Sequence, residues 1–235
     1  GGGGVASGRT NGIGNDVFFF SRNIGLSSGG DAIPILGGTR LTGRAGSYEV
    51  GFLNIQQREH NGTHATNFAV GRLKHNFMTN SDVGVMIMNK ELKDSPLFNR
   101  VVGADANLRF GQSTSFNAFL AKSSTPGVNS DDMAERLAFG YQDRKWTVQS
   151  SYNKIQSNFI NELGYYPRRG VRRYNERVQY TFRPNSKTIR QIWPHFIVDY
   201  FEDQNGHIDS KYIDFHLPIT LQNGVWIEMG KNPNV

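Results

Sequence analysis

The stretch VVGADANLRF, residues 101–110, alternates apolar and polar side chains along its length. Because successive side chains of a β-strand point to opposite faces, this stretch predicts a strand with one apolar face and one polar face. Similar stretches of about ten residues, each followed by a turn, recur along the chain and are typical of transmembrane β-barrels. The apolar positions are Val102, Ala104, Ala106, Leu108 and Phe110, and the polar positions are Gly103, Asp105, Asn107 and Arg109.

Turn signals divide the chain into about a dozen expected strands. Residues 35–44 and 48–52 predict a hairpin across Ala45-Gly46-Ser47, and residues 203–206, DQNG, predict another. Pro194 predicts a bend or a non-central position for a long aromatic stretch, and residues 131–137, DDMAERL, are the one candidate helix. We therefore expect an all-β fold: an antiparallel up-and-down transmembrane β-barrel to which this chain contributes about a dozen strands.

The expected domain organisation has two parts. Residues 1–16 are rich in glycine and predict a flexible lead-in. Residues 17–235 predict a partial outer-membrane barrel that starts with a short strand at 17–22. The last expected strand, residues 225–229, has no following partner, and a wide sheet with an open edge is prone to aggregation. We therefore expect the barrel to continue beyond Val235.

Composition narrows the functional classes. The 235 residues include no cysteine, which excludes disulfides and thiolate metal sites, and no run of 18 apolar residues that predicts a transmembrane helix. The mean hydropathy of −0.51 is compatible with a barrel in which only alternate strand residues face lipid. The net charge of +6 indicates either a solvated surface with basic lumen residues or attraction to polyanions. We expect no nucleic-acid partner, because no recognisable binding module accompanies the basic residues.

Five stretches occur in a recognisable order: FFFSRNIGL (18–26), IPILGGTRLTGRAGSYEVGFLNIQ (33–56), NFAVGRLKHNF (67–77), NRVVGADANLRF (99–110) and ELGYYPRRG (162–170). Together they resemble the uncharacterised C-terminal domain that follows a family-nine-like carbohydrate-binding domain in large outer-membrane proteins of Gram-negative bacteria. Such proteins are often labelled membrane-associated hydrolases. The resemblance implies a carbohydrate-binding β-sandwich upstream in the same protein and a location in the bacterial outer membrane. It transfers no catalytic residue to this chain.

The densest basic cluster follows the fifth of these stretches. Arginine suits bidentate capture of carboxylate or phosphate, so the cluster is a candidate ligand-binding site for an anionic glycan, lipid or solute. The alternative is that these arginines form ion pairs with Glu162, Glu176 or Asp199. The candidate ligand-binding residues are Arg168, Arg169, Arg172, Arg173, Arg177, Tyr165 and Tyr166.

A second set of polar residues has the parity expected of a barrel lumen. We expect Asn99, Asp105, Asn107 and Arg109 to form a hydrogen-bonded rung. The expected lumen-facing residues are Arg40, Arg44, Asp105, Asn107, Arg109, Gln149, Asn153 and Gln179, together with Arg177 of the basic cluster.

Catalytic and metal motifs are not found. The chain has no G-x-S-x-G elbow, and no carboxylate pair can be singled out. His60 and His64 have a metal-like spacing but lie in a Gly- and Asn-containing loop, and the other histidines are scattered. We expect no cofactor and no metal, and enzymatic activity is suggested by the family label alone.

The leading functional hypothesis is an outer-membrane barrel segment that handles or transports carbohydrate or another solute at the cell surface, with membrane lipid as its immediate partner. A soluble, aromatic-rich glycan-binding β-sandwich is the alternative, and it predicts two packed sheets with a dry core. A membrane-associated hydrolase is the third hypothesis. It predicts a cluster of carboxylates, or of serine and histidine, with perturbed pKa values.

Overall fold

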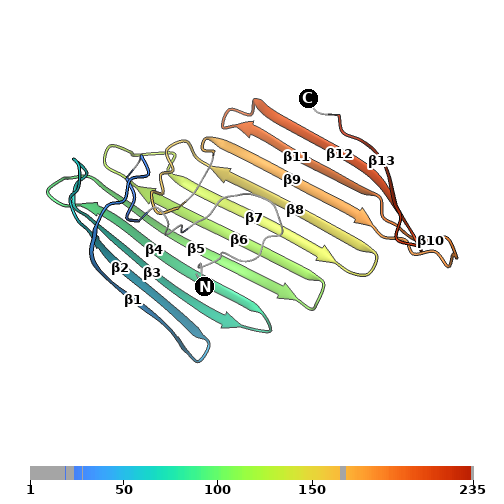
Figure 1. Ribbon diagram of the computed structural model, residues 1–235, viewed down its shortest axis with the longest axis horizontal. Helices are drawn as coiled ribbons and strands as arrows, with labels where there is room; N and C mark the ends of the chain where they lie inside the picture. Colours follow the sequence, from blue (N-terminus) through green and yellow to red (C-terminus); the bar gives the residue numbers. More distant parts are fainter. Residues whose placement is uncertain (1–18, 20–23, 28, 165–167, 234–235) are drawn as a thin grey trace. The chain divides into compact units, whose positions relative to one another are not determined.

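A computed structural model describes residues 19, 24–27, 29–164 and 168–233. Within them the chain forms β-strands joined by turns and loops, drawn in Figure 1. The strands are β1 (Ile35–Ala45), β2 (Tyr48–Gln57), β3 (Thr66–Phe77), β4 (Ser81–Leu92), β5 (Phe98–Phe110), β6 (Thr114–Ser124), β7 (Met133–Gln142), β8 (Trp146–Ile155), β9 (Val171–Tyr180), β10 (Ile189–Ile192), β11 (His195–Asp203), β12 (Ile208–Leu221) and β13 (Trp226–Lys231).

All thirteen strands belong to one sheet, with the order β1 to β9 followed by β11, β12 and β10, while β13 pairs with β12. The all-β, antiparallel, up-and-down prediction is confirmed at this level. The described strands do not form the two packed sheets that a β-sandwich requires. Within the described residues, no pairing joins β1 to β10 or β13, so the sheet is not closed into a barrel.

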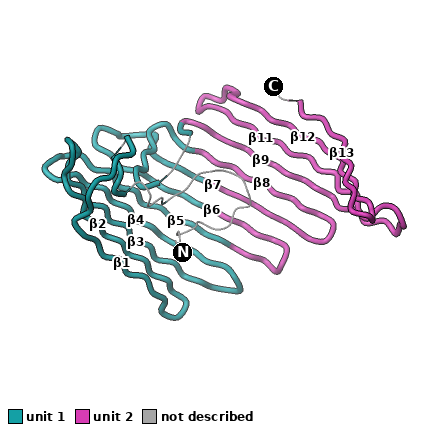
Figure 2. The backbone as a smooth tube through the Cα atoms, viewed as in Figure 1, with its two compact units in different colours: residues 1–107, 119–135, 155–169 teal, residues 108–118, 136–154, 170–235 magenta. Residues whose placement is uncertain are grey.

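The chain divides into two compact units, coloured in Figure 2. Unit 1 comprises Gly1–Asn107, Phe119–Glu135 and Ile155–Arg169. Unit 2 comprises Leu108–Ala118, Arg136–Lys154 and Gly170–Val235. Among the described residues, no helix is long and apolar enough to span a membrane.

In unit 1, the register of β1 to β5 separates the side chains onto two faces (Figure 1). Val50 on β2, Leu73 on β3 and Val85 on β4 are cross-strand neighbours, and each is more than two-fifths exposed. We call this side the apolar face of unit 1. Its exposed large side chains are Leu41, Tyr48, Val50, Phe52, Leu73, Val83, Val85, Ile87 and Val102.

The ends of this apolar face differ from its middle. Tyr48 stacks on His75 at a ring-centroid distance of 4.6 Å, and His75 stacks on Phe77. Toward the other end, Asn54 exchanges side-chain hydrogen bonds with Asn67. The apolar middle is thus bounded by an aromatic group on one side and by amides on the other.

The opposite side, the polar face of unit 1, carries charges near the β1–β2 and β3–β4 turns and an apolar cluster near the other strand ends. Phe159 and Leu163, in the connection between β8 and β9, are 0% and 1% exposed and pack on this cluster. The strand residues of the cluster are Phe68, Val70, Met86, Met88, Val101, Ala121, Ala134 and Ile155. The connection therefore folds onto the sheet and supplies two of the buried side chains in the core of unit 1.

Unit 2 has the same separation of faces. Val178 on β9, Phe196 on β11 and Phe215 on β12 are cross-strand neighbours on its exposed apolar face. Asn175, His195 and Asp214 are buried and share the polar face of unit 2. Two faces of opposite character are thus a property of each unit taken separately.

Two local predictions meet different outcomes. Pro194 does interrupt a strand: β10 and β11 both pair with β12, and Trp193 and Pro194 lie between them. The candidate helix at 131–137 is wrong, because Met133–Gln142 forms strand β7. Its Met, Ala, Glu, Arg and Leu residues favour a helix weakly, and pairing within the sheet outweighs that preference. The expected lead-in at 1–16 and most of the expected strand at 17–22 lie outside the described residues.

Candidate functional site

An ion pair that crosses a strand lies at the centre of the polar face of unit 1. Arg72 on β3 forms a two-pronged contact with Asp105 on β5: its Nη2 donates to Oδ2 at 2.8 Å, and its Nη1 pairs with Oδ1. The side chains are 12% and 14% exposed. Between them lies Gly84 of β4, where an added Cβ would stand 2.7 Å from Arg72 Nη2. Glycine at this position therefore leaves room for the guanidinium to cross β4.

A second polar network lies nearer the β3–β4 turn. Lys74 Nζ is 3.1 Å from Glu49 Oε2 and 3.9 Å from Asp82 Oδ2. Asn76 donates to Glu49 at 2.9 Å, and Asn107 donates to Asp82 at 2.9 Å. Charged and amide groups from four consecutive strands are thus linked on the side that the sequence predicts to be wet.

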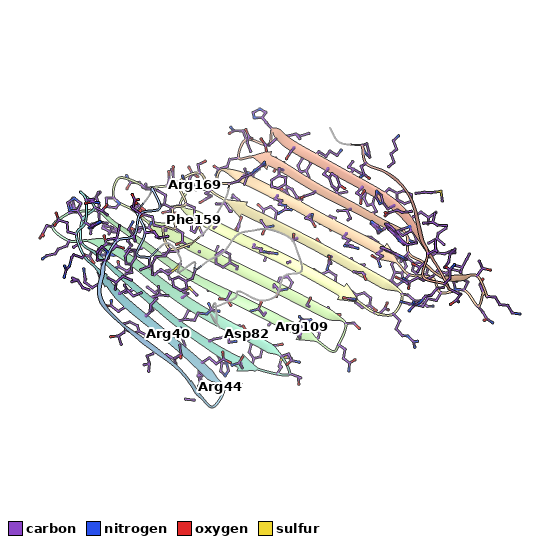
Figure 3. The ribbon with its side chains drawn as sticks, viewed as in Figure 1. Arg40, Arg44, Asp82, Arg109, Phe159 and Arg169 are labelled. Carbon is purple, nitrogen blue, oxygen red and sulfur yellow. The ribbon has the colours of Figure 1, made fainter. Side chains whose placement is uncertain are left out.

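The folded-in connection covers the other part of this face, and we call residues 156–164 the inward loop. Phe159 lies toward the strand ends opposite Arg44 and Asp82 (Figure 3). Polar groups of four strands hold the loop: Lys90 of β4 pairs with Glu162, Asn99 of β5 and Ser123 of β6 bond to its backbone, and the backbone N–H of Met133 at the start of β7 donates to Gln156 Oε1.

Asn99 is the central anchor of the inward loop. Its side chain is buried; Nδ2 donates to the Ile160 carbonyl at 2.8 Å and to Thr125 Oγ1 at 3.0 Å, and Oδ1 accepts from the Glu162 N–H at 3.0 Å. The expected polar rung is therefore wrong in one member. Asp105 and Asn107 do make cross-strand polar contacts, whereas Asn99 binds the loop because the loop backbone covers its position.

The other residues that the sequence predicts to face the lumen lie on strands, at positions that alternate as expected. Arg40 and Arg44, both labelled in Figure 3, share one side of β1. Arg44 is the cross-strand partner of Glu49 of the polar network. Asn153 is buried on β8, and Gln149 shares its parity. Arg109 lies near the end of β5 and falls in unit 2.

The basic cluster does not form one patch on one strand face. Arg168 and Arg169 are exposed in the connection before β9 and belong to unit 1, whereas Arg172, Arg173 and Arg177 lie on β9 in unit 2. Tyr165 and Tyr166 lie outside the described residues. Because side chains alternate, Arg172 points to the face opposite that of Arg173 and Arg177.

Each of the three arginines on β9 contacts a neighbouring side chain. Arg173 binds Asp199 through two hydrogen bonds of 2.7 Å, as the ion-pair alternative predicts. Arg172 pairs with Glu202 at 3.2 Å. Arg177 donates to Gln179 at 2.9 Å, which places both predicted lumen residues in one contact.

Three features were missed by sequence reasoning. Arg72 and Lys74 lie in a stretch noted for its resemblance, yet their charges were not assigned to the polar face. The core role of Phe159 and Leu163 has no strand periodicity to reveal it. His195 and His216, interpreted as scattered, are direct partners across the β11–β12 hairpin. Counting outward from the turn at 203–206 would bring them close but would miss their pairing, because the register shifts between Phe201 and Glu202.

Comparison of the chain with known protein families, with curated proteins and with solved structures finds no match.

Proposed function

We propose that this chain forms part of a β-barrel in the outer membrane of a Gram-negative bacterium, and that its polar face contacts a solute that passes through the barrel. One observation carries the proposal: exposed large apolar side chains share one face of the sheet, while charged and amide groups share the other, in each unit separately. Outer-membrane strands have this alternation, with the apolar side toward lipid.

The apolar face supports the membrane environment. Soluble monomers rarely expose contiguous apolar patches of more than a few hundred Å². On unit 1 the exposed apolar side chains of β2, β3, β4 and β5 are contiguous through the register. Their flanking aromatic and amide groups match a lipid core with an aromatic boundary.

The polar face supports a role in solute passage. It combines fixed charges, held by ion pairs such as Arg72–Asp105, with exposed cations such as Arg40 and Arg44. The inward loop occupies part of the same face, so in a closed barrel it would narrow the lumen. Such rings of charge and constrictions select what enters a pore. We propose carbohydrate as the solute class, in line with the resemblance described above, with the upstream carbohydrate-binding domain as a partner.

The membrane part of this proposal is tested by placing one charge on each of two exposed apolar positions. Val102, 56% exposed, lies mid-strand on the apolar face, and Met78, 70% exposed, lies in the β3–β4 turn. In lipid, Val102→Arg costs about 2–4 kcal/mol, whereas Met78→Arg is outside the bilayer core. In water, either exposed substitution costs less than about 0.5 kcal/mol.

The full-length protein and both variants are expressed in a Gram-negative host and fractionated. We expect the wild type and Met78→Arg in the outer membrane, with heat-modifiable migration on a gel, and a loss of assembled protein for Val102→Arg. A soluble wild type, or equal behaviour of the two variants, contradicts the membrane proposal. Conductance in planar bilayers, with neutral and anionic oligosaccharides added as blockers, then tests the solute class.

A further inference from the structure

Two histidines and two carboxylates come together on the polar face of unit 2. His195 lies on β11, Asp214 and His216 on β12, and Glu228 on β13. His195 and His216 are cross-strand partners, with ring centroids 5.4 Å apart. Glu228 is the partner of Pro218, two residues beyond His216, so it lies diagonally across from that histidine. Three adjacent strands therefore contribute to one cluster.

The donor atoms of this cluster converge. One ring nitrogen of each histidine and one carboxylate oxygen of Glu228 all lie within 4.8 Å of one another. Glu228 Oε1 is 2.5 Å from His216 Nδ1. A cation placed among three such atoms replaces contacts between them with metal–ligand bonds of about 2.0–2.2 Å.

Asp214 contacts both histidines of the cluster. Its Oδ1 is 2.9 Å from His216 Nε2, and its Oδ2 is 3.5 Å from His195 Nε2. Metal-binding histidines usually have a carboxylate on the nitrogen that does not bind the metal, which fixes the tautomer and the ring orientation. Asp214, with a side chain only 6% exposed, is placed to do this for both rings.

His195 has unused bonding capacity. Its side chain is 9% exposed, and its Nδ1 is buried with no hydrogen-bond partner among the described residues. A buried polar atom without a partner costs about 1–3 kcal/mol, so such atoms call for a specific explanation. A bound cation would use this capacity of His195, whereas His216 already contacts Glu228 through Nδ1 and both Asp214 and Asn232 through Nε2.

Glycine at position 230 makes room for the second histidine. Gly230 is the cross-strand partner of His216, and an added Cβ there would lie 2.2 Å from His216 Cδ2 and 2.5 Å from its Nε2. The imidazole therefore lies across the β13 backbone, where any larger residue would displace it. In this position the His216 ring also contacts Glu228.

We infer that His195, His216 and Glu228 bind a divalent transition cation, with Asp214 as the carboxylate that positions the two imidazoles. Two imidazole nitrogens and a carboxylate oxygen favour Zn²⁺ or Cu²⁺ over Ca²⁺ and Mg²⁺, which prefer all-oxygen sites. The inference depends on unit 2 alone and stands whether or not the chain crosses a membrane.

To test the site, the purified full chain is first treated with a chelator that removes bound metal. Binding of Zn²⁺ is then measured by calorimetric titration. We expect one Zn²⁺ per chain in the wild type and no saturable binding in His195→Ala or Glu228→Gln. Asp214→Asn should weaken binding by about 10–100-fold, as loss of a carboxylate behind a ligand does. The matched control is His207→Ala, because His207 is an 80% exposed histidine in the β11–β12 turn, paired with Asp203.

Copper provides a readout that reports the ligands directly. The electron paramagnetic resonance spectrum of the Cu²⁺-loaded wild type should show coupling to two nitrogens, reduced to one in His195→Ala. Gly230→Ala should lower Zn²⁺ affinity without removing any ligand, because it displaces the His216 ring.

Far-UV circular dichroism establishes that each variant keeps its β-structure. A folded wild type that binds no Zn²⁺, or a His195→Ala variant that binds as tightly as His207→Ala, overturns the inference. If His195→Ala does not fold, Glu228→Gln decides, since Glu228 is 24% exposed and less involved in packing. Unchanged affinity in that variant also overturns the inference.

Discussion

Arg72 and Asp105 are joined by a two-pronged ion pair although a whole strand separates them, because Gly84 on the intervening strand has no side chain. The pair is only 12–14% exposed, so solvent screens it less than it screens surface pairs. The pair thus holds two opposite charges in place on the polar face of unit 1 across three strands, β3 to β5, whereas an ion pair between neighbouring strands spans only two.

Gly84→Ala should therefore break this ion pair. The added methyl group would stand 2.7 Å from Arg72 Nη2, which forces the guanidinium away from Asp105. We expect a loss of about 1–3 kcal/mol in the free energy of unfolding, the range for a hydrogen-bonded charged pair. Chemical denaturation measures it, and a double-mutant cycle with Asp105→Ala should give a coupling close to the single-variant loss. Gly71→Ala is the control, because the space at its Cβ position is open.

The inward loop should depend on Asn99. Asn99→Ala removes three hydrogen bonds and leaves the Ile160 carbonyl and the Glu162 N–H without their partner. We expect destabilisation of about 2–3 kcal/mol and faster proteolysis within residues 156–164. Asn89→Ala is the matched control, because the Asn89 side chain bonds only at the exposed strand ends. Equal protease resistance in the two variants would show that Phe159 and Leu163 hold the loop without Asn99.

Single cysteines can report the two faces, because the chain contains none of its own. In the membrane-assembled protein, Glu49→Cys on the polar face should react with a charged, water-soluble thiol reagent. Val85→Cys, on the apolar face, should be protected until detergent or heat exposes it. Similar labelling rates for the two positions in intact membranes would argue against lipid on the apolar face.

The β7–β8 turn should carry a pH-dependent contribution to stability. The backbone N–H groups of Trp146 and Lys145, followed by the Tyr141 hydroxyl, donate to Asp143 and lower the pKa of its carboxyl below the ordinary 3.8. Since the folded-state pKa is depressed, the stabilisation is fully present above 3.8 and is lost as the pH falls through the folded-state value. Asp143→Asn, which cannot ionise, should be less stable than the wild type near neutral pH. The difference should shrink under acid. A difference that does not vary with pH would contradict this account.

The periodicity of the sequence predicts the strands well because each strand is two-faced and the register preserves the faces. Residues 101–110 place Val102 on the exposed apolar side and Asp105 on the polar side, as expected. The Ala45–Ser47 hairpin and the bend at Pro194 also follow from local chemistry. Such features depend on neighbours in the sequence, which is why they can be predicted.

Other features depend on contacts that no local pattern encodes. The MAERL segment of β7 has helix-favouring residues, and only sheet pairing makes it a strand. Asn99 has the parity of a rung but binds a loop more than sixty residues away. The pairing of His195 with His216 depends on a register shift between Phe201 and Glu202, which the turn sequence at 203–206 does not predict.

The residues that anchor the inward loop also predict an order in which parts of unit 1 fold. Lys90, Asn99, Ser123 and Met133 all precede residues 156–164 in the chain, at separations of up to 72 residues. Because these anchors lie on β4 to β7, we expect the loop to take its final place after those strands have paired, with burial of Phe159 as a late event. A probe on this loop would then report that step of folding separately from strand formation.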